Sequence, residues 1–187
     1  MKELSLNILD VAENSVKAGA TLTQILIREE KGRLTLTIKD NGCGMTEEVL
    51  RGVTDPFYTT RTTRKVGLGL PLLKLAAEQT GGTLTITSRH ESEYPETHGT
   101  EVTATFDTTH IDFTPMGDVV SSVVTLIQGH PDRDFLFRHE REGKPTVELD
   151  TAALREVLGA DVPLSEFSVL QWITEYLHEQ YDGAENT

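Results

Sequence analysis

Apolar and polar positions in the first part of the chain alternate in two ways, one typical of helices and one typical of strands. Residues 4–16 carry Leu, Ile, Val and Ala densely enough for a largely buried helix, which Gly19 should end. Residues 21–30 and 33–40 are rich in Thr, Ile and Leu and are separated by Lys-Gly. This pattern predicts an antiparallel hairpin.

The pattern downstream of the hairpin adds helices and further strands. It predicts a short helix over 46–53 with Thr46 as its cap, a loop over 55–66, a helix over 68–80 that Gly81 and Gly82 stop, and strands over 83–90 and 99–107. This order of elements predicts an α+β fold, a two-layer α/β sandwich with helices on one face of a mixed sheet.

The remaining residues predict a smaller α/β module. Their pattern predicts a helix over 121–128, a hairpin over 134–150 turning at Gly143, a helix over 151–159 and an amphipathic helix over 167–181. The last helix carries an apolar stripe of Val169, Leu170, Trp172, Ile173, Tyr176 and Leu177. Core packing is the ordinary role of such a stripe, and a docking face is the alternative.

Charge divides the chain unevenly and supports a boundary near residue 110. Residues 1–110 carry 12 basic and 15 acidic side chains, whereas residues 111–187 carry 5 and 15. We therefore expect one domain over 1–110 and a small acidic module of unknown role over 111–187. The net charge of −13 argues against a nucleic-acid backbone or an anionic membrane surface as the main partner, because both would be repelled.

The sequence also bears on location and redox chemistry. No apolar run approaches the roughly 20 residues that span a bilayer, and the acidic start lacks the pattern of a signal peptide. We expect a cytoplasmic protein. The single cysteine, Cys43, excludes an intrachain disulfide.

Three segments of the first part carry candidate chemistry. Asp10 and Asn14 share one face of the first helix, with Lys17 one turn further on. The segment 40–45, DNGCGM, ends a strand in an acid followed by glycines that let backbone approach a ligand. The segment 66–70, VGLGL, places glycines at a helix start, where backbone N–H groups favour an anion. Each segment alone also fits an ordinary surface pair, hairpin turn or helix start.

Taken together and in this order, the segments resemble the GHKL ATP-binding superfamily, which includes sensor histidine kinases, anti-sigma-factor kinases, gyrase B, Hsp90 and MutL. Residues 8–21, ILDVAENSVKAGAT, are similar to the N box, most closely to its MutL type, and IKDNGCGM is similar to the first glycine box. DPFYTTR and the following KVGLGLPLLKLAAEQTGG resemble the phenylalanine box, ATP lid and second glycine box of histidine kinases, and GTEV at 99–102 resembles the last strand.

The resemblance implies a site for ATP and magnesium. Asn14 would hold Mg²⁺ and Lys17 would reach a phosphate, while Asp40 would accept from the adenine amino group beside Thr100. The base would be lined by Gly42, Gly44 and Met45; the phosphates would meet the backbone of Gly67, Leu68, Gly69 and Leu70, and the lid residues Thr60, Arg61, Arg64 and Lys65. The alternative for the lid cations is a solvated loop.

The resemblance leaves the reaction open at position 10. The family's ATPases have a water-activating glutamate there, and many of its histidine kinases have asparagine. Asp10 is either a shorter general base or a helper for magnesium hydration.

The histidines restrict the kinase alternative. All six follow the nucleotide-binding motifs, and we expect His139 and His178 to lie on the surface. Histidine kinases carry their phosphoacceptor histidine before the N box, and only a few residues precede Leu4 here, so we expect that any phosphoryl transfer would require a partner protein.

The sequence therefore predicts an Mg²⁺-ATP-binding, histidine-kinase-like ATPase with a regulatory role. The alternatives are a protein kinase acting in trans, of the anti-sigma type, and a nucleotide-dependent binding module without turnover. The expected ligands are ATP and ADP. A protein partner is also expected, and the second module is a candidate for pairing two copies into a homodimer.

Overall fold

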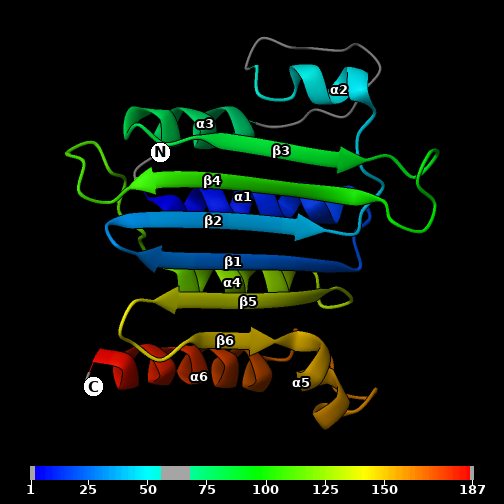
Figure 1. The fold of residues 1–187 in the computed structure, drawn as a ribbon. Helices are drawn as coiled ribbons and strands as arrows, with labels where there is room; N and C mark the ends of the chain where they lie inside the picture. Colours follow the sequence, from blue (N-terminus) through cyan, green and yellow to red (C-terminus); the bar gives the residue numbers. More distant parts are fainter. Residues whose placement is uncertain (1–2, 56–67, 186–187) are drawn as a thin grey trace.

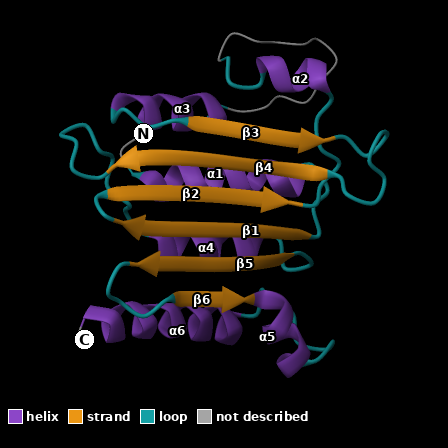
Figure 2. Cartoon of the chain, viewed as in Figure 1, coloured by secondary structure: helices purple, strands orange, loops and turns teal. Residues whose placement is uncertain are grey.

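The computed structural model describes residues 3–55 and 68–185, which form a six-stranded sheet and its covering helices (Figures 1 and 2). In chain order the elements are α1 (Leu4–Lys17), β1 (Leu22–Glu30), β2 (Arg33–Asp40), α2 (Glu47–Gly52), α3 (Gly69–Gln79), β3 (Leu84–Arg89), β4 (Gly99–Asp107), α4 (Val119–Gly129), β5 (Asp134–Arg141), β6 (Val147–Asp150), α5 (Thr151–Leu158) and α6 (Phe167–Glu185). The predicted fold class is confirmed. Of the predicted loop over 55–66, all but Asp55 lies outside the described residues.

The sheet has the strand order β3-β4-β2-β1-β5-β6 and is mixed. Its pairs are antiparallel except for β1 and β5, which run parallel. Lys31 and Gly32 turn the β1–β2 hairpin with φ of 51° and 73°. Two positive φ angles at the centre of a tight turn match the right-handed twist of the strands, so Lys-Gly sets the hairpin register.

One face of the sheet is buried and the other is largely polar. In β2, for example, Leu34, Leu36 and Ile38 are buried while Thr35 and Thr37 are half-buried on the opposite face. Helices α1, α3 and α4 cover the buried face, with α1 packed between the other two (Figure 1). The strict alternation of apolar and polar residues therefore decides which face the helices cover.

The sheet continues across the expected boundary at residue 110. β5 pairs over its whole length with β1, from Leu22 opposite Asp134 to Glu29 opposite Arg141. Buried residues from both parts form one hydrophobic cluster, in which Ile25 of β1 and Phe137 of β5 are completely buried partners. The division into two folding units stays a prediction.

The structure corrects one expectation about the second part, the surface position of His139, and shows that the apolar stripe of the last helix is only partly buried. His139 is only 3% exposed, so its expected surface position is wrong. It lies on the inner face of β5, because the alternation of that strand places every second residue under the helices. The stripe of α6 divides: Ile173 and Leu177 are completely buried, whereas Trp172 is 47% exposed and stacks on Tyr176.

Across residues 3–55 and 68–185, no helix combines the length and apolar character needed to cross a bilayer.

Candidate functional site

A cavity of about 810 Å³ opens between α1, the ends of β2 and β4, and the segment leading into α2. Its walls are mainly apolar, with polar groups concentrated on a few residues. The lining residues are Val11, Asn14, Ser15, Lys17, Ala18, Ile38, Asp40, Cys43, Gly44, Met45, Thr46, Val49, Val53, Leu70, His90, Thr100 and Val102. A largely apolar cavity with few polar groups is the usual form of a small-molecule site.

Asp40 is the most fully engaged polar group of the cavity. It ends β2, and its Oδ2 accepts a hydrogen bond of 2.7 Å from the hydroxyl of Ser15. Its Oδ1 accepts from the backbone N–H of Gly42 at 2.9 Å and of Thr100 at 3.3 Å. Three donors from three segments therefore fix this carboxylate, while a carboxylate offers about four acceptor positions. One position on Oδ2 remains for a donor in the cavity.

A second small network supports the same end of the cavity. The hydroxyl of Ser88 lies 2.7 Å from that of Thr100 and accepts a hydrogen bond of 2.7 Å from the backbone N–H of Met45. Ser88 also donates to the carbonyl of Gly99 at 3.2 Å. These bonds tie the glycine segment after β2 to β3 and β4, so the wall around Met45 is held by both strands.

Gly44 is required by the close approach of two backbone segments. Its φ is 71°, and a Cβ built there would lie 1.9 Å from the carbonyl oxygen of Arg89. The same two backbone segments are also joined by a hydrogen bond of 2.9 Å from the N–H of Glu91 to the carbonyl of Cys43. No side chain fits at this position.

Helix α1 places its polar residues along one side of the cavity. Asn14 and Lys17 line it, because α1 directs this face toward the end of β2. Asp10 is exposed, one turn earlier on the helix, and is not among the lining residues. A Cβ on Gly69 would lie 3.1 Å from that of Asp10, so the start of α3 is adjacent to Asp10.

The structure brings together some of the predicted site residues but not all. Those that line the cavity are Asn14, Lys17, Asp40, Gly44, Met45, Leu70 and Thr100. Those that are described but do not line it are Asp10, Gly42, Leu68 and Gly69. Thr60, Arg61, Arg64, Lys65 and Gly67 lie outside the described residues.

Sequence reasoning missed several polar residues of this site. Ser15, Ser88 and His90 were not predicted, although Ser15 and His90 line the cavity and Ser88 holds its wall. Serine and histidine are common on helices and strand ends, and only their partners distinguish them. A signal existed for Ser15 alone, since it follows Asn14 on the predicted N box.

The described residues form no metal-binding cluster by themselves. No group of three or more His, Cys, Asp or Glu residues there is arranged to hold a metal ion. Mg²⁺ usually keeps several waters and takes one or two protein oxygens together with substrate phosphates. The amide oxygen of Asn14 fits that limited role, and no resident metal centre is indicated.

Comparisons with known proteins bear on the family and the fold of the chain. Sporulation kinase A of Bacillus subtilis is 32% identical over 91 residues, which cover 49% of this chain and 15% of the kinase. The C4-dicarboxylate transport sensor protein DctB of Pseudomonas aeruginosa is 36% identical over 69 residues, 36% of this chain and 11% of that protein. The matched segments thus span less than a sixth of either relative.

Among solved structures, the Aquifex aeolicus MutL ATPase domain complexed with ADP has a TM-score of 0.55 at 17% identity. The likeness covers 84% of this chain and 68% of that domain, more than residues 1–110 can account for. The N-terminal domain of a DNA repair protein has a TM-score of 0.54 at 15% identity, over 80% of this chain and 53% of that one. Both show a shared fold.

The family described as histidine kinase-, DNA gyrase B-, and HSP90-like ATPase matches residues 2–110, which contain the whole cavity around Asp40. The chain therefore belongs to this family of GHKL ATPase domains.

Proposed function

We propose that the chain binds ATP and ADP with Mg²⁺ in the cavity around Asp40, and that it acts as a regulatory ATPase. The observation that carries the proposal is the free acceptor position on Asp40 Oδ2, at the polar end of an apolar cavity. The exocyclic amino group of adenine is a donor of the matching kind. The apolar side chains of Ile38, Met45 and Val102 offer surface for the base.

The phosphate end is assigned to α1 and to the start of α3. Lys17 would contact a phosphate as a flexible point charge, and the amide oxygen of Asn14 would contribute one ligand to Mg²⁺. The backbone N–H groups at the start of α3, from Leu68 to Leu70, would favour the remaining negative charge. When bound, Mg²⁺ would supply charge neutralisation at the phosphates.

Asp10 is our candidate for the hydrolytic residue. It lies one helical turn from Asn14 and adjacent to Gly69, which places it beside the proposed phosphate end. Its carboxylate would accept a proton from the attacking water, so that hydroxide attacks the terminal phosphorus and ADP leaves. The alternative role is to orient the hydration shell of Mg²⁺.

Calorimetric titration tests the nucleotide site directly. We expect Asp40→Ala to weaken binding of ADP by about tenfold or more, which is about 1.4 kcal/mol. Asp107→Ala is the matched control, because Asp107 ends β4 at the opposite end of the sheet and contacts Thr109. Equal affinity in wild type and Asp40→Ala would reject the adenine contact. Asn14→Ala should weaken Mg²⁺-dependent binding selectively.

Turnover separates the three proposed activities. Hydrolysis lost in Asp10→Asn with binding retained supports the ATPase, with Glu13→Gln as control because Glu13 points to His130. Labelled phosphate transferred to a co-purified protein would instead indicate a kinase in trans. Tight binding without either reaction would leave a nucleotide-dependent binding module.

A further inference from the structure

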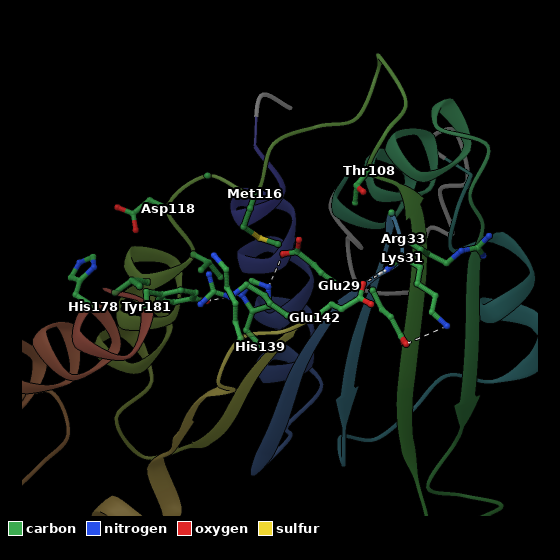
Figure 3. A pocket seen from close by; sticks show the side chains of 17 residues that line it. Glu29, Lys31, Arg33, Thr108, Met116, Asp118, His139, Glu142, His178 and Tyr181 are labelled. Carbon is green, nitrogen blue, oxygen red and sulfur yellow. Dashed lines mark hydrogen bonds and ion pairs between the residues drawn. The ribbon is translucent and has the colours of Figure 1, made fainter. Parts of the chain in front are cut away.

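Figure 3 shows a second cavity, of about 700 Å³. It lies at the end of the sheet opposite to Asp40, because Asp40 pairs with Thr23 at one end of β1 and Glu29 and Glu30 line the cavity at the other. Its walls come from the β1–β2 turn, the end of β5, the start of α4 and the last turns of α6. β1 connects the two ends, since the N–H of Leu22 donates to the side chain of Asn41 near the first cavity and Glu29 lines the second. Within residues 3–55 and 68–185, the predicted nucleotide-binding motifs contribute no residue to this second cavity.

His139 is fixed between two partners in the wall of this cavity. Its Nε2 lies 2.7 Å from Glu29 Oε1, and its Nδ1 lies 2.7 Å from the hydroxyl of Tyr181. A carboxylate only accepts, so Nε2 donates to Glu29. Burial raises the pKa of Tyr181, so its hydroxyl stays protonated and can donate.

The acids that line this cavity already have partners. Glu29 bonds to His139, and Glu30 pairs with Arg28 at 3.2 Å. Glu142 accepts from the backbone N–H of Lys31 at 2.9 Å. Asp118 caps α4 by accepting from the backbone and hydroxyl of Ser121, and these bonds lower its pKa.

Three cations of the same cavity lack such partners. Within residues 3–55 and 68–185, Arg33, Arg141 and Lys144 form no ion pair with an acid, and Arg141 and Lys144 lie near enough to Glu29 to lower its pKa. In the same part of the chain, Nε and Nη2 of Arg141 are shielded from solvent and have no hydrogen-bond partner. Its guanidinium lies over the ring of Tyr181, 4.9 Å from the centroid.

These contacts indicate what kind of ligand fits the cavity. Nε and Nη2 form one edge of a guanidinium, the edge that binds two oxygens of a carboxylate or phosphate in parallel. A donor edge that is buried without acceptors is unfavourable, so an acceptor entering the cavity is favoured once the guanidinium turns toward it. Lys144 belongs to the same turn, in which its N–H donates to the carbonyl of Arg141 at 3.1 Å.

We propose that this second cavity binds the oxyanion group of a small metabolite, with Arg141 as the main contact and Lys144 as the second. The charge distribution supports an anion, because within the described residues three cations of the cavity, Arg33, Arg141 and Lys144, have no ion pair in a chain of net charge −13. Met116 and Val119 add apolar surface beside them, which suits a small organic acid or a phosphate ester better than a bare inorganic ion. The proposal does not depend on nucleotide binding at the first cavity.

Nuclear magnetic resonance titration of the full chain tests the proposal, with inorganic phosphate and succinate as separate probes and sodium chloride at matched ionic strength as reference. We expect saturable shifts of the backbone signals of Glu142, Lys144 and Tyr181 with at least one probe. Saturation by phosphate alone assigns a phosphate group, and saturation by succinate alone assigns a carboxylate. Linear shifts with both probes, or shifts confined to the cavity around Asp40, would overturn the proposal.

Single substitutions test which side chain binds the anion. Arg141→Gln should weaken the saturating probe about tenfold, since a charge-assisted pair is lost. Arg138→Gln is the matched control on the same strand, because Arg138 lies outside the cavity and pairs with Glu140 at 3.0 Å. Lys144→Gln gives a second test if Arg141→Gln does not fold. Affinity equal to wild type in the folded variant would contradict the assignment.

Discussion

Ser15 and Asp40 are joined by a hydrogen bond of 2.7 Å that links α1 to the end of β2. The two residues are 25 positions apart, and both line the cavity that we assign to the nucleotide. The Ser15 hydroxyl occupies one acceptor position of Asp40 Oδ2. It therefore sets the direction of the remaining acceptor position on that oxygen. The contact thus connects the position of the first helix to the proposed recognition of the base.

Removing this hydroxyl should weaken nucleotide binding without unfolding the chain. We expect Ser15→Ala to raise the dissociation constant for ADP roughly 3- to 10-fold, the cost of one hydrogen bond of ordinary strength. Calorimetric titration with ADP measures this dissociation constant. Ser5→Ala is the control, since Ser5 is buried on the same helix but lies outside the cavity. An equal effect of both substitutions would make Ser15 a structural residue only.

The contact at Gly44 predicts a strong effect on stability. Gly44→Ala places a methyl group against the carbonyl of Arg89 and forces a residue with a side chain to keep φ at 71°. We expect a loss of about 2–4 kcal/mol in the free energy of unfolding, measured with urea.

A second glycine provides the comparison. Gly129 ends α4, and a Cβ added there would meet no atom within 4 Å, so Gly129→Ala should change stability by less than about 1 kcal/mol. Similar losses in both variants would mean that the backbone around Gly44 moves readily.

Asn7 is a buried amide that costs stability. It is 1% exposed, and within the described part of the chain neither its Nδ2 nor its Oδ1 has a hydrogen-bond partner. Asn7→Leu replaces the amide by an apolar group of the same branched shape, so we expect a gain of about 1–3 kcal/mol and a higher Tm.

The same substitution at Asn41 should act in the opposite direction. The side chain of Asn41 accepts from the N–H groups of Thr21 and Leu22 at 2.9 and 3.0 Å and donates to the hydroxyl of Thr21. Asn41→Leu should therefore lower Tm. A loss of stability in Asn7→Leu comparable to that in Asn41→Leu would show that Asn7 has partners.

The pair of Glu29 and His139 makes stability depend on pH in the acidic range. The hydrogen bond from His139 holds the pKa of Glu29 below its usual value of 4.5, against the opposing effect of burial, and Arg141 and Lys144 act in the same direction. An acid whose pKa is lower in the folded than in the unfolded state stabilises the folded state fully above pH 4.5, the usual pKa of Glu29. This contribution is lost as the pH falls through the pKa of the folded state.

We therefore expect Glu29→Gln to lower the free energy of unfolding by about 1 kcal/mol at pH 7, with a difference from wild type that shrinks below the usual pKa. Urea unfolding across this range measures the trend. Glu101→Gln is the control, because its contact with Lys39 is exposed and 3.9 Å long, and such pairs contribute little. A difference between wild type and Glu29→Gln in the free energy of unfolding that is constant with pH would show that the charge of Glu29 does not stabilise the fold.

Much of the fold follows from local patterns. The alternation in β1 and β2, the Lys31-Gly32 turn and the cap at Thr46 are properties of neighbouring residues, and each was predictable because its physical cause lies within a few positions. The family resemblance supplied Asn14 and Asp40 as a pair. Its lid residues, such as Arg61, lie outside the described part, and their role stays a prediction.

The sequence by itself determined where strands, turns and helices form, because those preferences are short-range. Only the tertiary structure decided that β5 pairs in parallel with β1, which buries His139 beside Glu29, and that Ser88 and Ser15 meet the cavity wall. Small polar side chains suit the surface and the interior equally well, so their place is set by partners that only the folded chain brings near.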